Sequence, residues 1–301
     1  MQPADATMRR WRETLGYVNW LLNPRHGRDV TQVYDLLSDR SPTERALYLN
    51  LGYWRSAETL DEACDALASL VAETAGMAPG DEVLDVGFGF ADQDMLWART
   101  FRPRRIIGLN VTASQVERAR RRVAEAGFGE QIDLRLGSAT RMPLEAASVD
   151  KVVALECAFH FDTRERFFTE AFRVLRPGGR LVVADILPMP PAARRSERLA
   201  QRWGWRQAAR KFLIPDANAY TREVYGEKLA AAGFVEPRME SIRDDVYLPL
   251  HRYLARDRAA VARLHPLLRV PVRIALRLDP GLVFSGLDYV LASAEKPRPA
   301  A

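Results

Sequence analysis

The stretch VLDVGFGFADQ, residues 83–93, decides the fold of this chain. Its first four residues are apolar except for Asp85, which is the composition of a short buried strand in a parallel sheet. Gly87 and Gly89 follow where the strand should give way to a helix. A ligand can lie against bare backbone at such a turn, at the carboxyl edge of the sheet and beside a helix N-terminus. The identity of that ligand decides the function.

Apolar runs alternate with helical stretches on from this turn. We predict strands at residues 82–86, 105–109, 132–136, 151–155, 180–184, 234–242 and 288–295. A helix is expected at residues 114–126, where Thr112 with Gln115 and Ser114 with Glu117 have the spacing of capping boxes. Alternation of this kind indicates right-handed βαβ units. We expect an α/β fold with a seven-stranded, mainly parallel sheet and helices on both faces.

The 301 residues fit one large domain or two small ones, and we predict a single domain. Its expected parts are a helical N-terminal cap (1–75, with a helix at 11–22), a binding core (76–190), helical lid insertions (191–217 and 244–284) and C-terminal core elements (218–243 and 285–297). Insertions after strands at one edge of such a sheet usually cover the ligand.

Composition limits the class of protein. The chain is 48% hydrophobic and 28% charged, as expected of a globular protein with a full core. Cys64 and Cys157 are far apart, which argues against a disulfide framework or a zinc site and fits a reducing compartment. The N-terminus lacks the apolar region of a signal peptide, and no apolar run is long enough to span a membrane. We predict a cytoplasmic protein.

The net charge of +5 comes mostly from arginines spread over several segments. No nucleic-acid-binding module is recognisable, so solvated arginine-rich faces are the favoured interpretation and we predict no nucleic-acid partner. Two basic amphipathic segments, residues 9–28 and 252–273, leave contact with an anionic membrane open as a minority view.

The charges around the glycine turn limit which class of ligand can bind there. A dinucleotide fingerprint would have a third glycine or alanine where this chain has Asp92. Asp92 and Asp94 place negative charge in the first helical turn, where a pyrophosphate needs positive potential. Asp85, before the turn, suits an ammonium or sulfonium group instead. The pattern therefore favours S-adenosylmethionine over NAD.

Polar residues follow the next two predicted strands. Asn110 ends the second strand, at the distance from Asp85 where a side chain reaches the ribose hydroxyls of a nucleoside; a simple turn residue is the alternative. Ser138 and Ala139 lie in the loop after the third strand, where such loops commonly flank the adenine; Ser138 is suited to bond its amine, and a plain turn is again the alternative.

The segments VLDVGFGF (83–90), IIGLN (106–110), GSATRMPLEAASVDKVVALE (137–156) and FRVLRPGGRLVVADI (172–186) together resemble the class I S-adenosylmethionine-dependent methyltransferases, which have a Rossmann-like sheet. The run NLGYW (50–54) is similar to natural-product O-methyltransferases. The resemblance implies that Tyr53 or Trp54 folds over the cofactor. With the residues above, it places Gly87, Gly89, Gln93, Gln115 and Glu156 in the cofactor site. Asn110 and Ser138 depart from the acidic residues common at their positions.

Methyl transfer to a hydroxyl needs alignment, exclusion of water and removal of a proton. His160, in LECAFHF (155–161), follows the fourth strand at the carboxyl edge, and Asp185 ends the neighbouring fifth strand. We therefore expect His160 as the base and Asp185 as the residue that orients it. Alternatives are a structural His160 packed among phenylalanines and a second-choice base, His251.

The expected function is methylation of a hydroxyl on a bulky secondary metabolite (a polyketide, nonribosomal peptide or sugar), with no required metal and as a monomer or homodimer. Aromatic residues of the insertions are expected to line the acceptor pocket or to form the core of the lid: Trp203, Trp205, Phe212, Tyr220, Tyr247 and Tyr253. Two alternatives stay open, namely C- or N-methylation of a lipid-like or quinone substrate and a non-catalytic partner-binding module.

Overall fold

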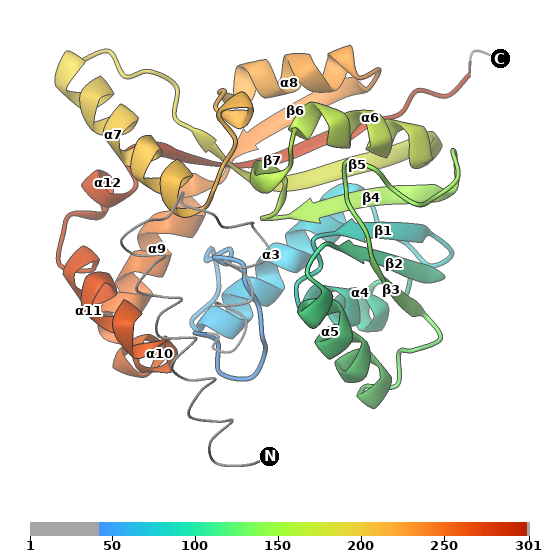
Figure 1. Cartoon of the computed structure of the whole chain (residues 1–301), viewed down its shortest axis with the longest axis horizontal. Helices are drawn as coiled ribbons and strands as arrows, with labels where there is room; N and C mark the ends of the chain where they lie inside the picture. Colours follow the sequence, from blue (N-terminus) through green and yellow to red (C-terminus); the bar gives the residue numbers. More distant parts are fainter. Residues whose placement is uncertain (1–41, 300–301) are drawn as a thin grey trace.

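The computed structural model describes residues 42–299, so the helix predicted at residues 11–22 lies outside the described residues. The described residues form a seven-stranded sheet in the order β3-β2-β1-β4-β5-β7-β6. The strands are β1 (Glu82–Val86), β2 (Arg105–Asn110), β3 (Ile132–Leu136), β4 (Val149–Leu155), β5 (Leu175–Pro188), β6 (Val235–Ser241) and β7 (Leu287–Glu295). Only β7 runs against the others (Figure 1). The predicted Rossmann-like, mainly parallel sheet is confirmed.

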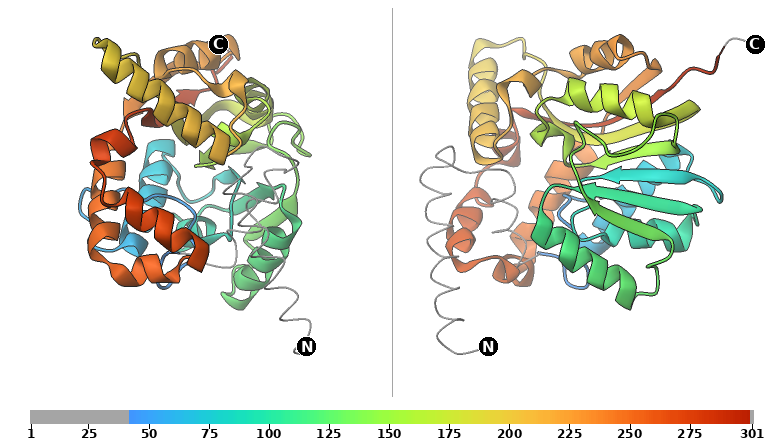
Figure 2. Two further views of the ribbon diagram at one scale, coloured as in Figure 1. Left: turned by 60° about the vertical axis from the view of Figure 1, so that its left-hand side comes forward. Right: turned by 45° about the vertical axis from the view of Figure 1, so that its right-hand side comes forward.

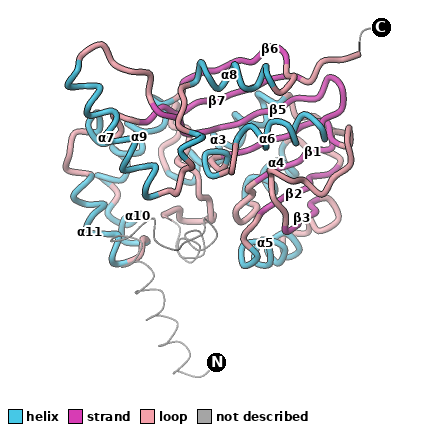
Figure 3. The backbone as a smooth tube through the Cα atoms, turned by 45° about the horizontal axis from the view of Figure 1, so that its top comes forward, coloured by secondary structure: helices cyan, strands magenta, loops and turns pink. Residues whose placement is uncertain are grey.

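Helices cover both faces of this sheet. They are α3 (Leu60–Ala75), α4 (Asp92–Thr100), α5 (Ala113–Glu125), α6 (Arg164–Val174), α7 (Arg195–Lys211), α8 (Arg222–Ala231), α9 (Arg243–Arg256), α10 (Arg258–Arg263), α11 (Pro266–Ala275) and α12 (Pro280–Val283). Alternate residues of β1, β2, β4, β5 and β7 enter two different clusters, since side chains of a strand alternate between faces. One cluster packs against α3, α4, α5 and α9, and the other against α6 and α8 (Figure 3).

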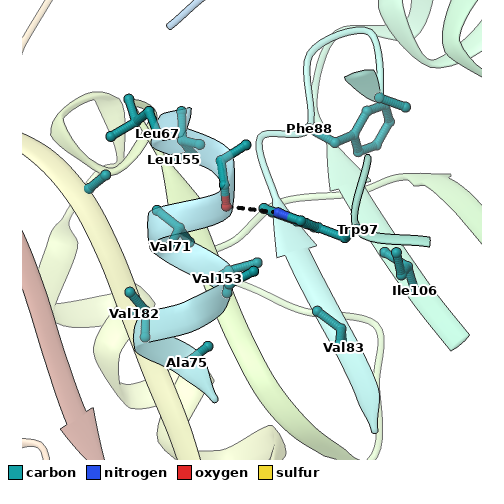
Figure 4. Close-up of a cluster of buried hydrophobic side chains, with 14 of the residues drawn as sticks. Leu67, Val71, Ala75, Val83, Phe88, Trp97, Ile106, Val153, Leu155 and Val182 are labelled. Atoms are coloured by element: carbon teal, nitrogen blue, oxygen red, sulfur yellow. Dashed lines mark hydrogen bonds between the residues drawn. The ribbon is translucent and has the colours of Figure 1, made fainter. Parts of the chain in front are cut away.

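The first cluster seats the glycine turn on the sheet. Val83 and Val153 contribute from neighbouring strands, and Leu67 and Val71 contribute from α3 (Figure 4). The indole Nε1 of Trp97 donates a hydrogen bond to the carbonyl of Ala68 at 2.9 Å, which ties α4 to α3. Burial of each such side chain stabilises the fold by roughly 1.5–3 kcal/mol. The turn between β1 and α4 is therefore held by rigid elements on both sides.

Residues 42–59 differ from the prediction of a helical cap, because they contain no helix or strand. The carboxylate of Asp61 accepts hydrogen bonds from the backbone N–H groups of Glu44, Arg45 and Ala46 at 2.7–3.0 Å. A complete capping box between Thr59 and Glu62 starts α3 only after this loop. Within the predicted cap, the described helix α3 packs on the sheet and belongs to the core.

The predicted insertions form α7 and α9–α12, which lie beyond the carboxyl ends of the strands (Figure 2). The predicted capping boxes at the start of α5 are not formed: Thr112 is the N-cap residue but makes no side-chain cap bond. The side chain of Gln115 accepts a bond from Asn110 instead. Strand β5 is longer than predicted, because every residue from Arg180 to Pro188 pairs with β7.

Candidate active site

A cavity of about 470 Å³ opens at the carboxyl edge of the sheet, a volume typical of small-molecule sites. It is lined by residues 47–50, 87–90, 92–93, 109–112, 115, 137–140, 155–157 and 160–162. These segments follow β1, β2, β3 and β4, together with the loop before α3. The structure therefore brings together the predicted glycine turn, Gln93, Asn110, Gln115, Ser138, Ala139, Glu156 and His160.

The glycine turn leaves backbone exposed to the cavity. Gly87 has φ +79°, and a Cβ atom there would lie 2.6 Å from the Cβ of Cys157. Its N–H donates to the carbonyl of Leu109 at 2.7 Å, which joins the turn to the end of β2. Gly89 has φ +58°. Both conformations favour glycine, so the bare backbone is required by the geometry of the turn.

The acidic residues near the glycine turn are either paired with an arginine or buried behind the cavity wall. Asp92 lines the cavity, but it forms a bidentate ion pair with Arg122 at 2.6 and 2.7 Å. Asp94 is fully buried and is not part of the cavity wall. Asp85 is also fully buried behind the wall, and its carboxylate accepts a hydrogen bond from Nε2 of Gln93 at 2.9 Å. Asp85 thus reaches the cavity only through Gln93.

A polar pair occupies the end of β2. The amide nitrogen of Asn110 donates to the side-chain oxygen of Gln115 at 2.9 Å, and its oxygen accepts from the N–H of Thr112 at 3.0 Å. The two partners fix which way the Asn110 amide faces, because each end has its own bond. On the other wall, the hydroxyls of Ser138 and Thr140 lie 2.9 Å apart. Both groups border the cavity, as expected for a nucleoside site.

Glu156 holds the loop before α3 against the sheet. Its Oε1 accepts hydrogen bonds from the N–H of Leu51 at 2.7 Å and from the hydroxyl of Tyr289 at 2.6 Å. Burial raises the pKa of Glu156 to about 7, although both hydrogen bonds oppose the shift. Glu156 has φ +51°, an uncommon conformation for a residue with a side chain. From the cavity wall, Glu156 thus joins the loop before α3 to β7.

Tyr53 and Trp54, the two aromatic residues predicted to fold over the cofactor, do not line the cavity of the described structure, and their contact with the cofactor stays a prediction. Trp54 is buried against Tyr253, with its Nε1 donating to the carbonyl of Leu51 at 3.0 Å. Tyr53 packs at the edge of the core on the α3 side. Residues 47–50 border the cavity instead, and Tyr48 among them donates to Asp65 at 2.5 Å. The sequence carries no local signal that separates these neighbours.

His160 borders the cavity at the end of a short turn after β4, with Phe161 and Asp162 beside it. Its ring lies 4.2 Å from the ring of Phe159. Burial lowers the pKa of His160 to about 3, with a hydrogen bond to the Phe212 backbone opposing and the charge of Arg164 adding to the shift. The imidazole is therefore neutral at physiological pH and able to accept a proton.

The hydrogen bonds of Asp185 go to residues other than His160, which argues against the predicted orienting role. Its carboxylate accepts hydrogen bonds from Nε of Arg164 at 2.8 Å and from the hydroxyl of Tyr225 at 3.3 Å. The other oxygen accepts from the N–H of Ile186 at 2.9 Å. Asp185 and Arg164 are both fully buried on the face covered by α6 and α8. The carboxylate is committed to a structural ion pair.

The predicted lid residues do not reach this cavity either, since residues 191–217 and 244–284 contribute nothing to its wall. Tyr247 is buried and stacks on Phe284, and His251 is buried with Nε2 3.4 Å from the carbonyl of Ala275. These contacts fit the core of a helical layer. Trp203, by contrast, is 62% exposed on α7.

Within residues 42–299, no group of three or more His, Cys, Asp or Glu side chains has the arrangement of a metal site. No helix in the same range has the length and apolar character needed to cross a membrane.

Comparisons with known proteins agree with this geometry. A family model described as a methyltransferase domain matches residues 84–183. The chain is 38% identical over 274 residues to erythromycin 3''-O-methyltransferase of Saccharopolyspora erythraea, covering 88% of this chain and 89% of that protein. It is 32% identical over 166 residues to 27-O-demethylrifamycin SV methyltransferase of Amycolatopsis mediterranei, covering 55% and 61%.

A likeness in three dimensions supports the fold alone. The crystal structure of geranyl diphosphate C-methyltransferase from Streptomyces coelicolor superposes with a TM-score of 0.68 at 18% identity, covering 90% of this chain and 99% of that chain. Three observations indicate S-adenosylmethionine as the methyl donor: the glycine turn, the polar side chains after β2 and β3, and the sequence similarity to known methyltransferases. The chain belongs to the class I S-adenosylmethionine-dependent methyltransferases, among the O-methyltransferases of secondary metabolism.

Proposed function

We propose that the acceptor is a hydroxyl of a polyketide or of a sugar attached to one, and that His160 removes its proton. The observation that carries this proposal is that His160 lines the same cavity as the glycine turn. The similarity to erythromycin 3''-O-methyltransferase supports the class of acceptor.

The residues of the cavity fit the donor in character. Bare backbone at Gly87 and Gly89 and the carbonyl-bearing side chain of Gln93 suit its amino-acid part. Asn110 and Gln115 suit the ribose hydroxyls, and the loop at Ser138 and Ala139 suits the adenine. When bound, S-adenosylmethionine supplies a methyl group already activated by a positively charged sulfur, and this charge is lost on transfer.

The work left to the protein is alignment, exclusion of water and removal of one proton. The hydroxyl oxygen of the acceptor forms the new bond to carbon, and its proton passes to the imidazole of His160. Burial alone would oppose a charged imidazolium at this position. His160 gains its positive charge as the cavity loses another, so the total charge of the cavity is unchanged. This balance of charge offsets the burial penalty that lowers the pKa of His160.

The test is conversion of a chosen acceptor. The purified protein would be incubated with S-adenosylmethionine and erythromycin lacking the 3''-O-methyl group, and products followed by mass spectrometry. Addition of one methyl group, located on oxygen by NMR, supports the proposal. A panel of quinones and amines tests for C- and N-methylation. Methylation of these compounds alone would contradict the proposed O-methylation.

The role of His160 is tested separately by His160→Ala and His160→Gln. We expect turnover to fall by about 10²–10⁴-fold in both variants, the range contributed by a positioned base. Affinity for S-adenosylmethionine, measured by calorimetry, should stay near that of the wild type. Unchanged turnover would rule out His160 as the base.

We also propose that the enzyme works in the cytoplasm as a monomer or homodimer. Both cysteines are free thiols, with Cys64 buried, which is the state expected in a reducing compartment. Sedimentation of the purified protein decides between the two assemblies.

A further inference from the structure

Two carboxyl groups face each other beneath the glycine turn. Asp85 comes from β1 and Asp94 from the first turn of α4, and neither side chain has any exposed surface. The two lie within hydrogen-bonding reach of each other, and Asp85 also accepts a bond from Gln93 at 2.9 Å. Beyond these contacts, neither carboxyl has a hydrogen-bond partner at another described residue. The methyl-transfer chemistry above uses neither group directly.

The two carboxyls cannot be ionised at the same time in this environment. The other titratable groups facing the pair are Asp92, already paired with Arg122, and the neutral thiol of Cys157. Burial raises the pKa of Asp85 to about 7, with bonds from Gln93 and Asp94 opposing. Burial, and then repulsion by Asp85, raise the pKa of Asp94 well above its usual range. The pair is stable when Asp94 stays protonated and donates a hydrogen bond to an ionised Asp85.

The pair reaches the donor site through one side chain. Gln93 borders the cavity and directs its amide nitrogen at Asp85. An amide held by its nitrogen presents its carbonyl oxygen in the opposite direction. A carbonyl oxygen can accept a hydrogen bond from an ammonium group, whereas an amide nitrogen cannot. The direction of this one amide therefore matters for a cationic amino acid.

We propose that Asp94 is a positioning residue for the methyl donor: its proton keeps Asp85 ionised, and ionised Asp85 keeps the carbonyl oxygen of Gln93 directed to the cavity. When Asp85 is protonated, its O–H group can donate to the Gln93 carbonyl, while its other oxygen can still accept from the amide nitrogen. The amide is then no longer held in one direction, and a share of the molecules turn its nitrogen toward the cavity. Affinity for S-adenosylmethionine should fall as the pH falls through the pKa of Asp85.

The experiment measures donor binding by calorimetry from about pH 5.5 to about pH 9, without an acceptor. For the wild type we expect Kd to rise below neutrality by up to about tenfold per pH unit, the limit for one linked proton. S-adenosylhomocysteine should behave in the same way, because it keeps the ammonium group but has no sulfonium. Donor binding is independent of the acceptor, so failure here is distinct from failure of the proposed function.

Two substitutions at one position separate positioning from packing. Asp94→Leu fills the space but removes the hydrogen bond to Asp85. The midpoint of the pH dependence of Kd should therefore rise by about one pH unit, and Kd at neutral pH should rise by up to about tenfold. Asp94→Asn keeps a donor N–H, so the midpoint should be no higher than in the wild type. Asp133→Asn, which removes a carboxylate on β3 outside the cavity, is the matched control and should leave Kd unchanged.

A second readout needs no ligand at all. At about pH 8 the infrared spectrum of the wild type should contain the band of a buried protonated carboxyl group, and Asp94→Asn should lack it. Two results would overturn the proposal. In the first, the pH dependence of Kd in Asp94→Leu has the same midpoint as in the wild type. In the second, Asp94→Leu and Asp94→Asn lose the same affinity at every pH.

Discussion

The guanidinium of Arg164 and the carboxylate of Asp185 form an ion pair of 2.8 Å with both side chains fully buried. Arg164 also donates to the carbonyls of Asn218 and Ile186, and its guanidinium lies 5.2 Å from the centre of the Tyr220 ring. These contacts join α6, β5 and the segment before α8 behind the cavity. Asp185, predicted from the sequence as the partner of His160, therefore has the contacts of a scaffold residue.

Removal of Asp185 should destabilise the protein, because it leaves the charge of Arg164 buried without a partner. We expect Asp185→Ala to lower the free energy of unfolding by about 3–5 kcal/mol, measured in urea. The double variant Arg164→Met/Asp185→Leu should recover much of that loss. An Asp185→Asn protein of wild-type stability with strongly reduced turnover would instead return Asp185 to the reaction.

The pH dependence of turnover should not contain the titration of His160. Its pKa of about 3 leaves the imidazole neutral throughout the physiological range. At saturating substrates, kcat of His160→Ala should follow the same pH profile as the wild type, lowered by about 10²–10⁴-fold. Added imidazole should restore part of the activity. An inflection present in the wild type and absent from His160→Ala would contradict the low pKa.

Alanine at the two glycines of the turn should have unequal effects. Both positions have positive φ, which strains alanine by about 1 kcal/mol in each case. The new Cβ at Gly87 meets Cys157 at 2.6 Å, whereas at Gly89 the nearest atom is Leu49 Cδ1 at 3.5 Å. Gly87→Ala should therefore be less stable than Gly89→Ala by roughly 1–3 kcal/mol in urea unfolding. Equal stabilities would show that Cys157 moves freely.

Glu156→Gln should make the protein more stable at alkaline pH. The folded pKa of Glu156, about 7, lies above its usual value of 4.5, so its contribution is full below about pH 4.5 and is lost as the pH rises through 7. A glutamine keeps an acceptor for Leu51 and Tyr289 and has no charge to bury. We expect a gain of about 1–2 kcal/mol at pH 8, reduced by solvent in the cavity, and little difference near pH 4. A variant less stable than the wild type at both pH values would contradict this.

Prediction from the sequence succeeded where the information is local. The run from Val83 to Gly89 specified a strand and its turn, because apolar composition and the glycines act over a few residues. The residues after β2, β3 and β4 met at one cavity, because parallel strands bring their carboxyl ends to a common edge. Asn110 lies beside Gln115 because the two residues flank the same turn between β2 and α5.

The failures concern partners distant in sequence. Asp92 carries negative charge in the first turn of α4, but Arg122 from α5 neutralises it. His160 follows β4 and Asp185 lies within the adjacent β5, yet the side chain of Asp185 points to the face where α6 places Arg164. Trp54 and Tyr48 lie in one irregular loop, and only its bonds to Glu156 and Asp61 decide which aromatic residue faces the cavity.

The sequence by itself thus determined the sheet, the glycine turn and the methyltransferase family, since short-range periodicity and family-specific segments encode them. The tertiary structure alone decided the charge and direction of each polar group. Asp85 faces Asp94 and Gln93, and Asp185 faces Arg164, because packing of α4 and α6 selects one neighbour for each carboxylate. A side chain's protonation and hydrogen bonds depend on atoms brought close by folding, and spacing along the chain does not specify them.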